Sequence, residues 1–252
     1  MKYEFKKSVD IGGKVINLLE GKTEVPTKCW LLIFLGWGQK GPADGSQISD
    51  LDDFGYQKFP LFETEFNIMC PQAVETYNES DPFIQQYMLR TYGEDIQIFM
   101  AGHSFGGRNI MEYVNGYGGN LPVKQVVGFM PIAGEMSYPL PVDPCTCADR
   151  PIFAYHGEND YTIRPVQSKK LVDLVNSCPT RVHKAELRVI PGVDHTGIMK
   201  YVFEPSRDAE GYKTIMSCFS PETQEIPGQV LKEGTRIFIR FTDGTEYEIG
   251  NQ

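Results

Sequence analysis

Hydrophobic residues along this chain gather into short runs that are separated by polar segments rich in glycine and proline. Seven runs have the length and β-branched or aromatic content of strands, and they lie at residues 14–19, 29–36, 66–71, 96–102, 125–134, 151–157 and 186–192. Several of them are apolar at almost every position, as strands buried on both faces of a parallel sheet must be. The pattern therefore predicts a mostly parallel central sheet.

Two segments between these runs have the periodicity of amphipathic helices. Residues 105–117 place one apolar stripe at Ile110, Met111, Val114 and Tyr117, and glycines follow that can end the helix. Residues 166–177 show a similar stripe after Pro165, a residue suited to a helix start. Strands that alternate with helices predict an α/β fold with a doubly wound sheet, in which functional loops gather at the carboxyl ends of the strands.

The last thirty or so residues follow a different pattern. "TRIFIRFTDGTEYEIG" (235–250) alternates apolar and polar residues around Asp243-Gly244, which predicts a β-hairpin. The preceding "SPETQEIPGQ" has the composition of a linker. We therefore expect a main domain at residues 1–222, followed at 223–252 by a linker and a small C-terminal β-hairpin.

Composition narrows the classes of partner. The chain has 252 residues, of which 41% are hydrophobic and 23% charged, as in ordinary globular domains. Its net charge of −9 repels phosphate backbones and anionic lipid, so we expect no nucleic-acid or membrane partner. The N-terminal residues hold no apolar run suited to a signal peptide or a membrane span. The expectation is a cytoplasmic protein, or one exported by a route that the sequence does not show.

Six cysteines are spread along the chain without the density of a disulfide framework. Cys145 and Cys147 form the one close pair, and no second pair of cysteines or histidines lies near it to complete a metal site. The sequence predicts unpaired thiols and no metal.

The stretch "QIFMAGHSFGGRN" (97–109) carries the chemistry. An apolar strand runs into Gly102-His103-Ser104-Phe105-Gly106 and then into the predicted helix, which is the pattern of a nucleophile elbow. Such a turn holds the serine hydroxyl above the sheet, and the flanking glycines let strand and helix pass close to each other. Ser104 is the predicted nucleophile.

A serine hydroxyl needs a general base, and in this arrangement the acid and then the histidine follow the serine along the chain. His195 lies just after the strand at 186–192, at the carboxyl edge where the base belongs. His156 and His183 are interpreted as core or surface residues. His195 is the predicted base.

The acid that orients the base belongs in the loop after the strand at 151–157. That loop offers Glu158 and Asp160, of which we favour Asp160. Three further carboxylates are interpreted as solvated loop charges: Asp194, which adjoins the histidine, and Asp143 and Asp149, which precede a strand.

The oxyanion of a tetrahedral intermediate needs two fixed N–H donors. The elbow supplies the N–H of Phe105. The loop in "LLIFLGWGQKG" (31–41) can turn back over the site at Gly36 and Gly38, which points the N–H of Trp37 inward.

Six motifs together resemble a known family: "FLGWGQKG", "FPLFETEFNIMCPQA", "AGHSFGG", "PIAGE", "AYHGENDYTIRP" and "IPGVDHTG". The chain is similar, over about residues 28 to 220, to α/β-hydrolases of the esterase group that includes carbohydrate (feruloyl and acetyl) esterases and phospholipase/carboxylesterase-like "predicted peptidases". The resemblance implies the α/β-hydrolase fold, the triad Ser104, Asp160 and His195, an oxyanion hole at Trp37 and Phe105, and no cofactor. Leu35 replaces the family's usual histidine, and the stretch from Asp160 to Pro165 is one residue longer than usual.

The length of one loop limits the class of substrate that the sequence predicts. Sixteen residues separate Gly134 from Pro151, too few for a lid domain. The expected site is therefore open and suits a short or aromatic acyl group on a carbohydrate or another polar alcohol. The candidates to line it are Trp37, Gln39, Thr76, Tyr77, Arg108 and Tyr161.

Two other functions stay open at this point. The same triad and fold support a serine peptidase acting on small peptides. A binding or assembly protein on a hydrolase scaffold is the second alternative, with the hairpin at 235–250 as its interaction element. In either case the edge of the hairpin could pair with a second copy to form a homo-oligomer.

Overall fold

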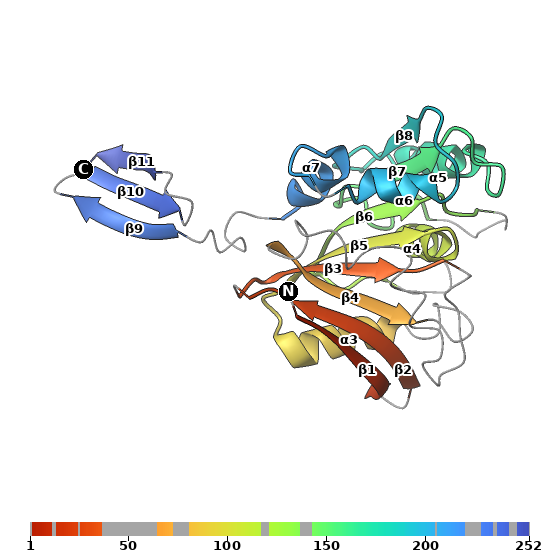
Figure 1. Cartoon of the computed structure of the whole chain (residues 1–252). Coiled ribbons are helices and arrows are strands. Elements are labelled where there is room, and N and C mark those ends of the chain that lie inside the picture. The colour runs from red at the N-terminus through yellow and green to blue at the C-terminus, as the bar shows by residue number, and fades with distance from the viewer. Residues whose placement is uncertain are drawn as a thin grey trace.

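An eight-stranded sheet organises the structure, a computed structural model that describes residues 2–11, 14–24, 26–36, 65–72, 81–116, 121–136, 143–204, 206–219, 228–233, 236–241 and 246–251. The strand order is β1-β2-β4-β3-β5-β6-β7-β8 (Figure 1). The strands are β1 (Lys2–Ile11), β2 (Lys14–Lys22), β3 (Cys29–Phe34), β4 (Asn67–Gln72), β5 (Gln97–His103), β6 (Val126–Ile132), β7 (Phe153–Gly157) and β8 (Glu186–Ile190).

The six strands from β4 to β8 in this order run parallel, whereas β2 pairs antiparallel with both β4 and β1. All seven predicted strands are confirmed as β2 to β8. Strand β1 was not predicted because "KYEFKKSVDI" has too many charged residues to form an apolar run. The carboxyl ends of the parallel strands lie at one edge of the sheet. The predicted residues Ser104, Asp160 and His195 follow the carboxyl ends of β5, β7 and β8 in the sequence.

Helices cover both faces of the sheet, which confirms the doubly wound α/β prediction. On one face lie α3 (Asp81–Tyr92), α4 (Phe105–Asn115) and α5 (Val166–Asn176), and on the other α6 (Gly197–Val202) and α7 (Glu210–Met216). Within the described ranges, no helix combines the length and the apolar composition that a membrane crossing requires.

Strand β3 shows why the predicted runs are apolar at every position. Trp30, Leu32 and Phe34 pack into the core on the α3–α5 side, whereas Leu31 and Ile33 pack into the core beneath α6 and α7. Successive side chains of a strand point to opposite faces, so a strand covered on both sides needs apolar residues throughout.

The C-terminal residues form a second sheet of their own, with strand order β11-β10-β9 (Figure 1). The predicted hairpin is confirmed as the antiparallel pair β10 (Arg236–Phe241) and β11 (Glu246–Asn251). The appendage is nevertheless a three-stranded sheet and not a hairpin alone, because β9 (Gly228–Glu233) begins in the segment interpreted as a linker. The sequence does not predict this strand, because its two apolar residues, Val230 and Leu231, are adjacent and do not alternate with polar residues. The turn at Asp243-Gly244 lies outside the described residues.

The prediction of unpaired cysteines was wrong for one pair. Cys145, in the turns before β7, forms a disulfide with Cys178, just after α5, across 33 residues of sequence. The two segments lie side by side, since the Val182 N–H donates to the Ala148 carbonyl at 2.8 Å. Spacing along the chain does not reveal this neighbourhood, because the fold creates it.

Candidate active site

Ser104 occupies the strand–turn–helix junction that the sequence predicts, between the end of β5 and the start of α4. Its backbone has φ 54° and ψ −111°, a region that residues with a side chain rarely adopt. The turn is fixed on both sides, because the Ser104 N–H donates to the Ile132 carbonyl at 2.9 Å and the Ser104 carbonyl accepts the Arg108 N–H at 2.8 Å. The serine is therefore held in a strained conformation by the end of β6 and the first turn of α4.

The glycines around Ser104 allow α4 to approach the sheet. A Cβ on Gly106 would lie 2.1 Å from the Phe34 carbonyl oxygen, and one on Gly102 would lie 2.3 Å from the Gly106 oxygen. The elbow thus packs directly on the end of β3. Phe105 is the first residue of α4, whereas Trp37, the other predicted oxyanion donor, lies outside the described residues.

The structure brings Asp160 and His195 together. Asp160 is 2% exposed, and its Oδ1 accepts the backbone N–H groups of Thr162 and Ile163 at 2.9 and 2.8 Å. Its Oδ2 lies 2.7 Å from His195 Nδ1. Because a carboxylate oxygen only accepts, Nδ1 carries the proton and Nε2 is the ring nitrogen left to take one up.

The two carboxylates that compete with Asp160 for this position are engaged elsewhere. Glu158 Oε2 accepts the Gly192 N–H at 3.1 Å. Asp194 Oδ1 accepts the Gly197 N–H at 2.7 Å at the start of α6, and this hydrogen bond lowers the pKa of Asp194. Although Asp194 adjoins His195 in the sequence, its carboxylate is bound to the start of α6 and not to the His195 ring.

His103 joins the elbow to the His195 loop. Its Nε2 lies 2.7 Å from the backbone oxygen of His195, and the two rings lie with centroids 4.7 Å apart. Because the carbonyl only accepts, Nε2–H is the donor, and burial lowers the pKa of His103 to about 4. The residue before Ser104 thus fixes the backbone of His195. The elbow motif contains this histidine but gives no signal of the role.

Of the two environments that the sequence left open for His156, core or surface, the structure shows the core, and the ring also contacts the predicted acid. Its ring is fully covered, and Nε2 lies 3.1 Å from Asp160 Oδ2. The one sequence signal of this contact is a spacing of four residues across the turn after β7. His183 is exposed.

The predicted cleft residues divide into three groups. Tyr161 follows Asp160 directly and is 88% exposed. Arg108 instead donates from Nε to Glu112 Oε1 at 2.8 Å, one turn further along α4. The other four, Trp37, Gln39, Thr76 and Tyr77, lie outside the described residues.

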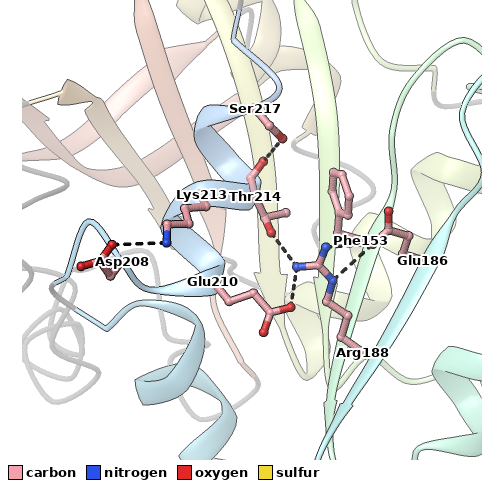
Figure 2. A pocket seen from close by; sticks show the side chains of 8 residues that line it. All are labelled: Phe153, Glu186, Arg188, Asp208, Glu210, Lys213, Thr214 and Ser217. Atoms are coloured by element: carbon pink, nitrogen blue, oxygen red, sulfur yellow. Dashed lines mark hydrogen bonds and ion pairs between the residues drawn. The ribbon is translucent and has the colours of Figure 1, made fainter.

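A cavity of about 550 Å³ is lined by other residues, whose side chains Figure 2 shows. Phe153 and Glu186, which line it, begin β7 and β8, whereas Asp160 and His195 follow the opposite ends of these strands. Its central cation, Arg188, is already paired with the lining groups Glu186 (2.8 Å), Glu210 (2.6 Å) and Thr214 (2.8 Å). In the part of the chain that the structure describes, no three His, Cys, Asp or Glu side chains are grouped to hold a metal ion.

No protein-family model and no curated protein sequence matches the chain. Solved structures do match it. A thermostable esterase aligns with a TM-score of 0.60 at 14% identity, over 85% of this chain and 62% of that chain. Est1E from Butyrivibrio proteoclasticus aligns with a TM-score of 0.55 at 15% identity, over 85% and 98% of the two chains. CarC, a serine hydrolase involved in carbazole degradation, aligns with a TM-score of 0.57 at 12% identity, over 86% and 99%.

These structural matches, at 12–15% identity, are evidence for the fold of the chain. The chain spans 62% of the length of the thermostable esterase, whereas it spans almost all of Est1E and CarC. The matches cover 85–86% of this chain. The chain has the α/β-hydrolase fold.

Proposed function

We propose that this protein is a serine hydrolase that cleaves carboxylic esters, with Ser104 as nucleophile, His195 as base and Asp160 as orienting acid. The contact between Asp160 Oδ2 and His195 Nδ1 at 2.7 Å is the observation that carries the proposal, because it leaves His195 Nε2 able to accept a proton. The strained turn at Ser104 supports it, since such a turn costs stability and is found where a function requires it.

The reaction follows the course of acyl transfer to a serine. His195 Nε2 takes the Ser104 hydroxyl proton while Oγ attacks the ester carbonyl, and the N–H groups of Phe105 and Trp37 hold the oxyanion. The His195 imidazolium then gives its proton to the departing alcohol, which leaves an acyl-serine. A water molecule then loses a proton to His195 Nε2 and attacks the acyl carbon. The bond to Ser104 Oγ breaks, His195 returns the proton to Oγ, and the carboxylic acid leaves.

The substrate class that we propose is an ester of a short or aromatic acid with a carbohydrate or another polar alcohol. The sixteen residues between Gly134 and Pro151 favour an open site. Among their described residues, 143–150 form turns that the Cys145–Cys178 disulfide ties to the end of α5. A structure of Est1E with ferulic acid bound also matches this chain, with a TM-score of 0.54 at 13% identity. That likeness supports an aromatic acid as one member of the class.

The decisive experiment compares wild type with Ser104→Ala on p-nitrophenyl acetate, butyrate and octanoate and on methyl ferulate. We expect hydrolysis of the acetate, the butyrate or the ferulate by wild type, and its loss in a folded Ser104→Ala variant. A fluorophosphonate probe should label wild type and not the variant, because it reacts only with an activated serine.

Two results would count against the proposal. Absence of both ester hydrolysis and fluorophosphonate labelling in the wild type would overturn the assignment as a serine hydrolase. Labelling of Ser104 together with a preference for octanoate would keep the serine hydrolase and overturn the substrate class.

A further inference from the structure

His156 stands at the end of β7 with both ring nitrogens in contact with polar atoms. Nε2 lies 2.7 Å from the Ile163 carbonyl oxygen, and Nδ1 lies 2.8 Å from Ser168 Oγ on α5. Nε2 also lies 3.1 Å from Asp160 Oδ2. The ring therefore connects β7, to which His156 belongs, with the loop that carries Asp160 and with the helix that follows this loop.

The partners of His156 determine where its proton resides. A backbone carbonyl only accepts, so Nε2 carries the hydrogen, and Nδ1 then accepts the hydroxyl proton of Ser168. Burial lowers the pKa of His156, which keeps the ring neutral at pH 7. His156 thus presents a fixed, uncharged N–H group to the oxygens of Ile163 and Asp160.

The carboxylate of Asp160 is consequently restrained at both oxygens. Backbone N–H groups of Thr162 and Ile163 hold Oδ1, while Oδ2 faces the rings of both His195 and His156. The two rings compete for electron density on one oxygen, because each directs an N–H group toward it. A substitution of His156 must therefore alter the hydrogen bond between Asp160 and His195.

We propose that His156 is a positioning residue, which through its contact with Asp160 Oδ2 sets the orientation and the basicity that the carboxylate offers to His195. The role rests on the proposed function insofar as Asp160 and His195 act in catalysis. His156 touches neither substrate nor reacting atoms and acts through Asp160. Without its N–H, more negative charge on Oδ2 faces His195, and the His195 imidazolium becomes easier to form.

The other titratable groups near His195 among the described residues stay in place in such a test. His103 faces it from the end of β5 and is kept neutral by burial. Asp194 adjoins it in the same loop and is bound to the start of α6. A change in the His195 titration after replacement of His156 therefore reports on Asp160.

The test measures the titration of the His195 Cε1–H by NMR in the full chain, which has four histidines to assign. In His156→Phe we expect the His195 pKa to rise by about half a unit or more. The acid limb of kcat/KM with p-nitrophenyl acetate should move to higher pH by the same amount. His156→Gln, whose amide can again donate, should return part of the shift. Ser168→Ala is the matched control, because it removes the other partner of the ring, is equally buried, and leaves Nε2–H in place.

A purely structural role gives a different result. The proposal is overturned if His156→Phe is less stable while its His195 titration coincides with that of wild type. Should His156→Phe fail to fold, nitrogen shifts of wild type at pH 7 to 8 decide. They must show the neutral His156 ring protonated at Nε2 and not at Nδ1, and the opposite tautomer overturns the proposal. The NMR titration does not require turnover. A wild type with neither ester hydrolysis nor fluorophosphonate labelling therefore refutes the proposed function and leaves this test intact.

Discussion

Asp160 Oδ2 and His195 Nδ1 meet at 2.7 Å although 35 residues separate them in sequence. The contact follows from the pairing of β7 with β8, whose last residues, Gly157 and Ile190, lie opposite each other in a parallel ladder. The loop after each strand thus leaves the sheet at the same edge and the same height. The close approach of Gly157 to the Val193 carbonyl, where a Cβ would lie at 2.3 Å, brings the two loops into contact.

Replacement of Asp160 by Asn should remove most of the activity. The amide NH₂ cannot accept the Nδ1 proton as the carboxylate does, so His195 loses both its orientation and the charge that stabilises the imidazolium. We expect kcat on p-nitrophenyl acetate to fall by roughly 10³- to 10⁴-fold. Steady-state kinetics across pH 6 to 9 would measure the effect.

The control for this substitution is Glu158→Gln, in the same loop and two residues away. Glu158 accepts the Gly192 N–H, and the glutamine oxygen can accept it as well. We expect kcat to change less than twofold, or about 0.4 kcal/mol. A large loss in Glu158→Gln with a small loss in Asp160→Asn would reverse the assignment of the acid.

Replacement of Ser104 by Gly should stabilise the protein while it abolishes activity. The backbone at φ 54° and ψ −111° costs a residue with a Cβ about 1–3 kcal/mol, whereas glycine adopts it freely. Glycine also loses more conformational entropy on folding, which offsets part of this relief. We therefore expect a net gain of about 1 kcal/mol in the free energy of unfolding. Urea denaturation would measure it.

Ser104→Ala is the matched variant, because it also loses the hydroxyl but keeps the Cβ and its strain. It should unfold at a lower urea concentration than Ser104→Gly. If the glycine variant is instead the less stable of the two, the turn is not strained by its backbone conformation.

The sequence predicts those parts of the site whose causes are local. The Gly102-x-Ser104-x-Gly106 pattern follows from steric limits that act within a few residues, so the elbow could be located to the residue. The strands from β2 to β8 were also predictable, because burial on both faces requires apolar residues at every position.

The remaining parts depend on which loops the fold brings together. Glu158 and Asp160 lie two residues apart with the same charge, and the contact with His195 singles out one of them. The role of His103 requires the His195 loop to pass over the end of β5, and the Cys145–Cys178 bond requires the segment after α5 to reach the turns before β7. No local pattern encodes either neighbourhood.

The disulfide between Cys145 and Cys178 should contribute measurably to stability. It closes a loop of 33 residues, and the loss of chain entropy in the unfolded state predicts about 3–4 kcal/mol. Reduction under native conditions should lower the free energy of unfolding by up to that amount, measured by urea denaturation with and without a reductant. The Cys145→Ser/Cys178→Ser double variant should match the reduced wild type and no longer respond to the reductant. A double variant that still responds would place the sensitive bond at other cysteines.

His103 should make the protein less stable as the pH falls below 6.5. Burial lowers its pKa from 6.5 to about 4 in the folded chain. Between these two values the unfolded chain binds a proton that the folded chain excludes, so the free energy of unfolding decreases with falling pH. From pH 7.5 to pH 5 the loss from His103 is about 2 kcal/mol. Burial lowers the pKa of His156 as well, which adds a loss of the same sign.

His103→Gln separates this contribution from the rest of the molecule, because the glutamine amide can donate to the His195 carbonyl but does not titrate. The difference in unfolding free energy between wild type and His103→Gln should therefore shift by about 2 kcal/mol in favour of the variant between pH 7.5 and pH 5. His183→Gln, at an exposed histidine, should show no such shift. Parallel pH profiles for wild type and His103→Gln would mean that the folded chain takes up a proton at His103, and that its contact with the His195 backbone survives as a charged hydrogen bond.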